Sequence, residues 1–193
     1  VIPMTYREAM DLGEKVLKMA DIADAKVDAW LLLEMVCKID RNFYYLHLED
    51  DLSEEQVSGY EIALKKRAEH IPLQYIVGET EFMGLRFKVN SSVLVPRQDT
   101  ETLVEEALKV IEPGMKVLDL CTGSGCIIIS ILHNIVNVEG DAVDISRQAL
   151  NVAIENAKLN DVVVNFERSD LFDNVTGTYD VIVSNPPYIP TAQ

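Results

Sequence analysis

The stretch "KVLDLCTGSGC", residues 116–126, decides the fold class of this chain. Its first five residues form a short apolar run that contains one carboxylate, Asp119. Two glycines, Gly123 and Gly125, then interrupt the run, and an apolar segment at 124–135 is predicted to be a helix. A strand that passes through a glycine turn into a helix is typical of a parallel α/β sheet, whose strands are covered on both faces.

The same alternation continues toward the C-terminus. Further strands are predicted at 140–144, 162–166 and 179–185, and an amphipathic helix is predicted at 146–160. Strands that alternate with helices indicate a Rossmann-like α/β fold with a doubly wound sheet. We assign this domain to residues 93–193.

A small all-helical domain is predicted for residues 1–72. Its sequence contains two capping boxes, at residues 5–8 and 53–56, each of which is expected to begin a helix. Apolar residues near helical spacing predict another helix at about 25–39. No catalytic signature is found in this domain.

Residues 73–92 are interpreted as a β-hairpin that links the two domains. Extended runs at 76–77 and 85–89 are separated by glycines, which is typical of a hairpin. The helix that follows is expected to be capped by Asp99 or Thr100 and to end near residue 111.

The composition excludes several classes of function. The chain has 193 residues, with 17 Lys and Arg against 32 Asp and Glu, and a net charge of −15. Tight binding to a phosphate backbone needs clustered basic residues, so no nucleic-acid partner is expected. No apolar run approaches the roughly 18–20 residues that span a bilayer, so no membrane partner is expected either. Three cysteines and three histidines without zinc-ligand spacing predict reduced thiols, no metal site and a cytoplasmic location.

Ligands of open α/β sheets bind beyond the carboxyl ends of the strands. The turn after the first strand is therefore expected to supply the cofactor-binding residues Cys121, Thr122, Gly123, Ser124 and Gly125. Asp144 ends the second strand, where a carboxylate accepts hydrogen bonds from ribose hydroxyls. It could instead cap the next helix, although Ser146 can do so as well. Because the turn has no basic residue, S-adenosylmethionine, which has a sulfonium and no phosphate, fits better than a dinucleotide.

Two further carboxylates are candidate cofactor ligands. Asp119 could bind the methionine end of the cofactor, or it could bond the N–H groups of its own loop. Asp170, in "SDLF" at residues 169–172, could accept a hydrogen bond from the adenine amine while Leu171 and Phe172 flank the ring. The alternative for this segment is a loop cap followed by two core residues.

The most specific motif is "SNPPYIP", residues 184–190, at the end of the last strand. Asn185 offers a side-chain carbonyl and Pro186 a backbone carbonyl, while Pro186 and Pro187 fix φ and hold both acceptors rigidly. Tyr188 offers a flat aromatic face. Two hydrogen-bond acceptors and an aromatic ring suit the binding of a planar –NH2 group. Acceptors that lie off the plane of this group would localise the lone pair of its nitrogen, which favours methyl transfer. A plain Pro-Pro turn would leave the asparagine and the tyrosine unexplained.

Together these motifs resemble class I S-adenosylmethionine-dependent methyltransferases with an NPPY motif. The carrying segments are "VLDLCTGSGC" (117–126), "AVDIS" (142–146) and "VSNPPYIP" (183–190). Two upstream segments, "HIPLQYIVGETEFMGLRFKVN" (70–90) and "VLVPRQDTETLVEEAL" (93–108), are similar to the bacterial peptide chain release factor glutamine methyltransferases, the HemK/PrmC family. The resemblance covers essentially the whole chain.

The resemblance implies methylation of the glutamine side-chain amide in the Gly-Gly-Gln loop of peptide chain release factors, with S-adenosylhomocysteine as product. It implies a cofactor loop at residues 121–125, a ribose acid at Asp144, an adenine-flanking Leu171 and a substrate clamp at 185–188. The catalytic residues would be Asn185, Pro186 and Tyr188, and Asn185 is also expected to contact the cofactor. A release factor is then the expected partner, and the protein is expected to be a monomer.

The sequence departs from the family pattern at two places. Cys121 stands where the family usually has glycine, which costs on the order of 1 kcal/mol if this position needs a positive φ. The family's catalytic domain also continues with further strands, so the sheet within this chain is expected to be incomplete. The alternatives are an adenine-N6 nucleic-acid methyltransferase and a catalytically incomplete, cofactor-binding fragment.

Overall fold

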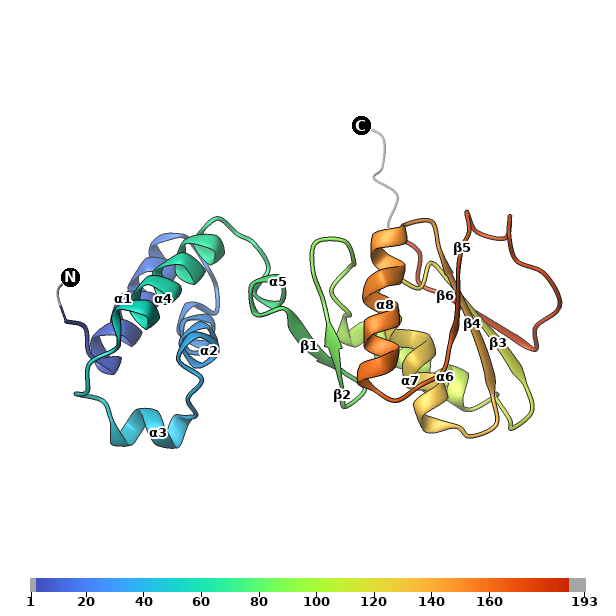
Figure 1. The fold of residues 1–193 in the computed structure, drawn as a ribbon, viewed down its shortest axis with the longest axis horizontal. Coiled ribbons are helices and arrows are strands. Elements are labelled where there is room, and N and C mark those ends of the chain that lie inside the picture. Colours follow the sequence, from blue (N-terminus) through green and yellow to red (C-terminus); the bar gives the residue numbers. More distant parts are fainter. Residues whose placement is uncertain (1–2, 188–193) are drawn as a thin grey trace. The chain divides into compact units, whose positions relative to one another are not determined.

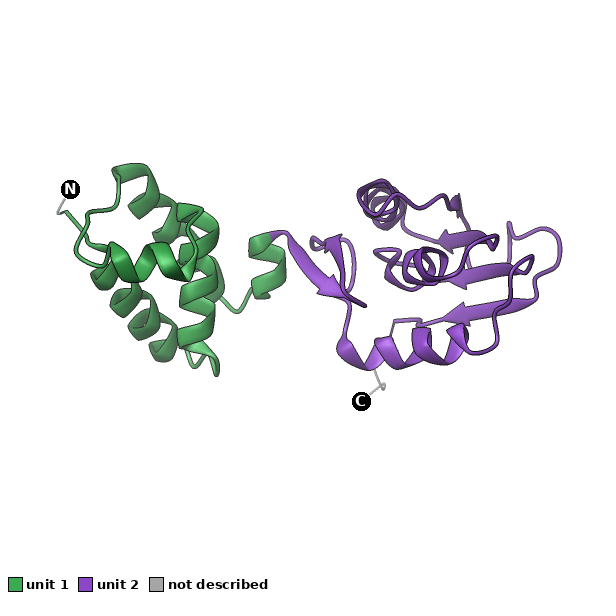
Figure 2. Cartoon of the chain, turned by 90° about the horizontal axis from the view of Figure 1, so that it is seen from below, with its two compact units in different colours: residues 1–77 green, residues 78–193 purple. Residues whose placement is uncertain are grey.

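The computed structural model describes residues 3–187, and the chain divides into two compact units, residues 1–77 and 78–193 (Figure 2). Within the described residues, the elements of the first unit are helices, with one isolated β-bridge between Thr5 and Asp51. The second unit contains the hairpin, the parallel sheet and the remaining helices. Each unit has its own hydrophobic core. Within residues 3–187, no helix combines the length and the apolar character that crossing a membrane requires.

The first unit is built from the helices α1 (Tyr6–Met19), α2 (Ala25–Cys37), α3 (Arg41–Leu46), α4 (Glu54–Ala68) and α5 (Leu73–Val77). The sequence predicted where α1, α2 and α4 begin. Both predicted capping boxes form, with Thr5 and Ser53 as the N-caps of α1 and α4. Helix α3 was not predicted; the Asp40 side chain caps it by accepting a hydrogen bond from the N–H of Phe43.

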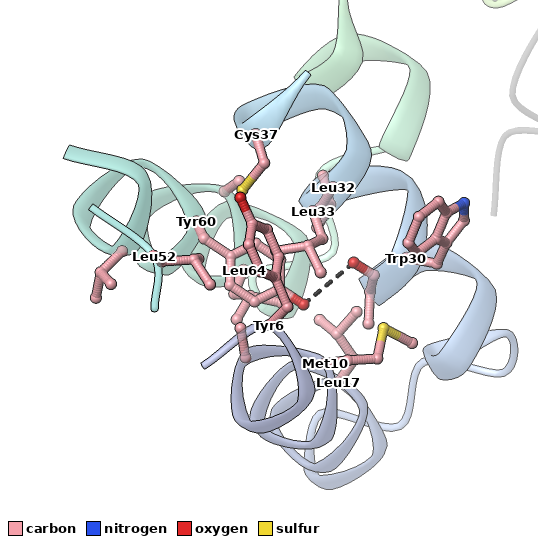
Figure 3. Packing of buried hydrophobic residues seen from close by; sticks show 14 of the residues in the cluster. Tyr6, Met10, Leu17, Trp30, Leu32, Leu33, Cys37, Leu52, Tyr60 and Leu64 are labelled. Carbon is pink, nitrogen blue, oxygen red and sulfur yellow. Dashed lines mark hydrogen bonds between the residues drawn. The ribbon is translucent and has the colours of Figure 1, made fainter. Parts of the chain in front are cut away.

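Tyr60 is at the centre of the first core (Figure 3). Its ring is fully buried, and its hydroxyl donates a hydrogen bond of 3.1 Å to the carbonyl of Ala29. A Cβ at Gly13 would lie 2.0 Å from this hydroxyl oxygen. Gly13 therefore makes room on α1 for the tyrosine that joins α4 to α2.

Residues 76–77, predicted as part of a strand, lie instead in helix α5. The carbonyl of Pro72 accepts hydrogen bonds from the N–H groups of Tyr75 and Ile76, so the chain makes a helical turn after the proline. Ile76 also packs against the core of the first unit. Helical packing of this apolar residue has overridden its β propensity.

The hairpin itself is confirmed, as β1 (Glu79–Phe82) and β2 (Leu85–Lys88) paired antiparallel. Met83 and Gly84 both have positive φ, as a two-residue type I′ turn requires. Phe82 and Phe87 are fully buried in the core of the second unit. The hairpin therefore contributes core side chains to the unit that carries the sheet.

Helix α6 (Gln98–Leu108) follows the hairpin and begins earlier than predicted. Its N-cap is Arg97, which makes no side-chain capping bond, so the expectation of a cap on Asp99 or Thr100 is wrong. The backbone N–H of Thr100 already donates to the carbonyl of Arg97 within the first turn.

The sheet has the strand order β5-β4-β3-β6, and all of these strands are parallel. Its elements are β3 (Lys116–Leu120), α7 (Cys126–Asn134), β4 (Glu139–Asp144), α8 (Arg147–Leu159), β5 (Asn165–Arg168) and β6 (Val181–Ser184). The third predicted strand, 162–166, is displaced to β5. The N–H of Val162 still bonds the carbonyl of Ala157 at the end of α8, so the ladder begins later.

The two faces of the sheet are covered differently (Figure 1). Val117, Ala142 and Val183 pack in the core that α6, α7 and α8 share with the hairpin. The opposite face, with Leu118 and Val143 among its residues, is covered in the described part of the chain by the segment between β5 and β6. Since β4 and β6 flank β3 on opposite sides, the strand order reverses at β3.

Candidate functional site

The candidate cofactor turn lies at this reversal of strand order. The last residue of β3, Leu120, is in register with Val143 of β4 and Ser184 of β6. The ends of the three strands therefore meet at one edge of the sheet, where the turn at residues 121–125 leads into α7. A topological switch point of this kind is where open α/β sheets bind their ligands.

The two glycines of the turn have different roles. Gly123 has φ +56° and no heavy atom within 4 Å of the position that a Cβ would take, so its backbone faces open space. Gly125 has φ +81°, and a Cβ there would lie 2.9 Å from Ile129 Cδ1 and 3.1 Å from Ala153 Cβ. Gly123 therefore leaves room for a ligand, while Gly125 allows α8 to pack against the start of α7.

Cys121 adopts φ 59°, in the left-handed region that favours glycine. Burial, followed by the charges of Asp144 and Asp119, raises the pKa of its thiol. The thiol therefore stays protonated at neutral pH and is a poor nucleophile.

Replacement of Cys121 by glycine is expected to stabilise the protein by about 0.5–1 kcal/mol, because it removes the left-handed strain of a Cβ. Cys121→Val is expected to have the opposite effect, since a β-branched residue fits this region worst. Urea denaturation of both variants measures the difference. A Cys121→Gly variant less stable than the wild type would contradict the assignment of strain.

Asp144 connects the end of β4 to the turn. Its Oδ2 accepts a hydrogen bond of 2.9 Å from the N–H of Gly123, and its Oδ1 accepts one of 2.9 Å from the N–H of Ser146. Ser146 itself caps α8 through the N–H of Ala149, as expected. The cap of α8 is thus supplied by the serine, and the half-buried carboxylate of Asp144 is fixed beside the turn with acceptor capacity to spare.

Asp119 is completely buried beneath the turn. Its Oδ2 accepts a hydrogen bond of 2.7 Å from the Thr122 hydroxyl, while its Oδ1 has no hydrogen-bond partner among the described residues. Burial raises the pKa of Asp119 to about 7, while the bond from Thr122 and the nearby backbone N–H of Ile128 oppose that rise. A buried oxygen without a partner is the kind of acceptor that an incoming ammonium or N–H group would satisfy.

This pKa makes stability depend on pH in a definite direction. Between about pH 4 and pH 7 the folded protein keeps a proton on Asp119 that the unfolded chain has released. The free energy of unfolding contributed by this group therefore falls as pH rises through that window and is constant above it. Asp119→Asn is expected to remove this decline, measured by urea denaturation at a series of pH values. Equal slopes for the variant and the wild type would contradict a raised pKa.

Asn185 follows β6 directly and reaches the same edge. The Ser184 hydroxyl donates a hydrogen bond of 2.9 Å to the carbonyl of Leu120, which ties the end of β6 to the end of β3. The side-chain Nδ2 of Asn185 donates to Thr100 Oγ1 at 3.2 Å. Pro186 and Pro187 are exposed. Tyr188, the aromatic member of the predicted clamp, lies outside the described residues.

The segment that follows β5 places Asp170 and Leu171 on the surface. Asp170 is exposed, and its negative charge contributes to the raised pKa of Cys121, so it is near the turn. Leu171 and Phe172 are 53% and 54% exposed, which excludes the alternative that they are core residues. Ser169 instead closes the loop, by donating to the carbonyl of Leu171 and accepting from the N–H of Asn174.

The structure adds residues to the site that sequence reasoning did not assign to it. A shallow depression at the edge is lined by residues 121–124 of the turn and by Asn185, together with Leu94, Val95, Pro96, Arg97, Thr100, Cys126 and Ile127. Most of these belong to the stretch before and at the start of α6. In the sequence these residues stand out only as part of "VPRQDT", and the spacing of its polar residues does not indicate a catalytic or binding role. Arg97 is the basic side chain in this lining, and it is exposed to solvent.

Two larger hollows lie elsewhere in the second unit. One, of about 410 Å³, is between β2 and α8, and the other, of about 470 Å³, covers the opposite face of the sheet near Lys116 and Asp141. In the second, the Asp141 carboxylate accepts from Tyr179, Lys116 and Asn165, so its acceptors are already used within the protein. Neither hollow brings together the predicted site residues.

The residues at the edge fit a nucleoside with a charged amino-acid tail. The open backbone at Gly123 admits a ligand, the fixed Asp144 can accept from ribose hydroxyls, and the unpartnered Asp119 oxygen can accept an N–H group. These are the donors and acceptors that S-adenosylmethionine would need here.

Two family models match the chain. The first, described as the PrmC N-terminal domain, covers residues 8–78. The second, described as the methyltransferase small domain, covers residues 97–193. The two matches fall on the helical unit and on the sheet-bearing unit.

Curated relatives carry the name release factor glutamine methyltransferase. The protein from Koribacter versatilis is 37% identical over 96% of this chain and 68% of its own length. That from Moorella thermoacetica is 39% identical over 98% and 69%, and that from Cereibacter sphaeroides is 44% identical over 96% and 67%. The chain thus spans about two thirds of the length of these relatives.

Among solved structures, the chain is similar to the tRNA (uracil-54, C5)-methyltransferase of Pyrococcus abyssi in complex with S-adenosyl-L-homocysteine. The match covers 56% of this chain and 27% of that one, with a TM-score of 0.49 and 17% identity.

Proposed function

Since the chain belongs to the release factor glutamine methyltransferase family, we propose that it methylates the side-chain amide nitrogen of a release-factor glutamine, using S-adenosylmethionine. The glutamine would be that of the Gly-Gly-Gln loop. The observation that carries the proposal is the position of Asn185, which follows β6 at the sheet edge where the turn after β3 begins. An amide-binding group and a cofactor turn are thereby adjacent.

The cofactor would be held by the edge of the sheet. Asp144 would accept from the ribose hydroxyls, the unpartnered Asp119 oxygen from the amino group, and Gly123 would admit the ligand against its backbone. Asp170 and Leu171 are proposed at the adenine. When bound, S-adenosylmethionine supplies an electrophilic methyl group on a sulfonium.

Asn185 and Pro186 would bind the substrate amide. An amide nitrogen is a poor nucleophile because its lone pair is delocalised into the carbonyl. The Asn185 Oδ1 and the Pro186 carbonyl can accept its two N–H groups and hold the nitrogen at a fixed distance from the methyl group. Tyr188 is proposed to stack on the amide plane. No strong base is needed before transfer, since the methylated amide loses its extra proton readily.

Labelled S-adenosylmethionine tests the proposal directly. We expect label in an intact release factor and none in the same factor whose Gly-Gly-Gln glutamine is replaced by alanine. Duplex DNA, offered in parallel, tests the adenine-N6 alternative. Label that appears only in DNA, or that persists in the substituted release factor, would contradict the proposed function.

We also propose the coarser properties that go with this function. The substrate is a protein, and the net charge of −15 favours a partner with a basic surface over a nucleic acid. We propose that the protein is cytoplasmic, as its proposed substrate is, and that it is a monomer. Size-exclusion chromatography with light scattering tests the last point.

A further inference from the structure

The Asn185 side chain is hydrogen-bonded to a residue from another part of the chain. Asn185 Nδ2 donates a hydrogen bond of 3.2 Å to the hydroxyl oxygen of Thr100, in the first turn of α6. Thr100 is 9% exposed, so most of its side chain is buried. Both residues also line the depression at the edge of the sheet.

The orientation matters because the two ends of an asparagine amide have opposite hydrogen-bonding character. The oxygen accepts, whereas the nitrogen only donates. A substrate –NH2 group is itself a donor, so it can be bound only by the oxygen. If the side chain turned by 180°, two donor groups would face each other, and the substrate would lose one of the two acceptors proposed for it.

We propose that Thr100 is a positioning residue, which holds the nitrogen of Asn185 and thereby presents its Oδ1 to the substrate amide. This inference rests on the proposed function, because it assigns the substrate to the oxygen side. It concerns a residue that no motif of the sequence singled out as functional.

Thr100 can hold the Asn185 side chain because the first turn of its helix, α6, is itself bonded to the hairpin. The neighbouring carboxylate of Glu101 accepts a hydrogen bond of 2.8 Å from the N–H of Met83, in the turn of the hairpin. Val104, one turn later, is fully buried in the core with Phe82 and Phe87. The first turn of α6 is thus fixed to the hairpin, and Asn185 is fixed at its backbone end by the bond between Ser184 and Leu120.

The decisive variants are Thr100→Val, which keeps the shape and removes the acceptor, and Thr100→Ser, which keeps the acceptor. We expect Thr100→Val to lower kcat for release-factor methylation by about 10- to 30-fold, as loss of one partly buried hydrogen bond does. KM and the cofactor Kd are expected to change less than about twofold. Thr100→Ser is expected to retain most of kcat. The control is Thr102→Val on the exposed face of the same helix, which is expected to change nothing.

A second measurement is independent of catalysis. The side-chain NH2 of Asn185, assigned by NMR with an Asn185→Asp variant, is expected to exchange slowly in the wild type and faster in Thr100→Val. An Asn185 NH2 that exchanges at the free-amide rate in the wild type would overturn the inference, as would an unchanged kcat in Thr100→Val. Slow exchange without any release-factor methylation would refute the proposed function and leave the held orientation standing.

Discussion

Asn185→Ala is expected to lower the rate of methyl transfer to a release factor by about 10²–10³-fold, the size of effect seen when one preorganised polar group of a reacting centre is removed. Alanine removes the acceptor proposed for the substrate N–H and also the group that Thr100 holds. The cofactor Kd is expected to remain within about threefold, because the turn and Asp144 are untouched. Single-turnover transfer of labelled methyl, together with calorimetry of cofactor binding, measures both quantities.

Asn151→Ala provides the matched control for this variant. Asn151 is an exposed asparagine on α8 that is not among the residues lining the depression at the sheet edge, and its replacement is expected to leave the rate unchanged. Undiminished transfer by Asn185→Ala would refute the clamp. A rate lost together with cofactor binding would place Asn185 on the cofactor instead, a role that the sequence also predicted for it.

Asp144→Asn is expected to weaken the binding of S-adenosylmethionine by about 10²-fold or more. The change removes the charge proposed to accept from the ribose hydroxyls, and hydrogen bonds to charged groups are worth about 1.5–3 kcal/mol each. The backbone N–H groups of Gly123 and Ser146 each donate to this carboxylate at 2.9 Å. In the variant, the NH2 of the asparagine would face one of these two donors, so one of the two hydrogen bonds would be lost. Calorimetry with the cofactor measures the loss.

Glu139→Gln separates this effect from a general change in charge. Glu139 begins the same strand β4 at its opposite end and is exposed, so its neutralisation is expected to leave cofactor binding unchanged. Since Asp144 also organises the turn, the thermal stability of Asp144→Asn is measured in parallel. Wild-type affinity in a folded Asp144→Asn variant would contradict the role proposed for the carboxylate.

Much of the fold could be predicted because its signals are local. The strand 116–120 was predicted with its observed ends, and both capping boxes form as read. Such signals depend on residues within a few positions of one another. The errors arose where backbone hydrogen bonds to a neighbouring helical turn, or packing on a core, outweighed the β propensity of the residues. Residues 76–77 are helical because they follow Pro72 and because Ile76 packs on the helical core. Strand β5 begins later in the sequence than predicted because the N–H of Val162 is bonded to the carbonyl of Ala157 at the end of α8.

The candidate site divides in the same way. The turn at 121–125, Asp144 and Asn185 could be predicted, since each follows a predicted strand and parallel strands end at one edge of a sheet. Thr100 and Arg97 could not, because they come from a stretch that precedes the first strand of the sheet. No periodicity in "VPRQDT" tells which side chain faces the edge.

The sequence by itself determined the class of the sheet, the residues at the ends of its strands and the resemblance to glutamine methyltransferases. These properties depend on short motifs, in which the hydrogen bonds and turns involve residues close together in the sequence. Only the tertiary structure decided that Cys121 occupies a left-handed position, that the Asp119 oxygen is buried without a partner, and that Thr100 holds Asn185. Backbone strain, burial and a contact across 85 residues arise from packing, so no local pattern can encode them.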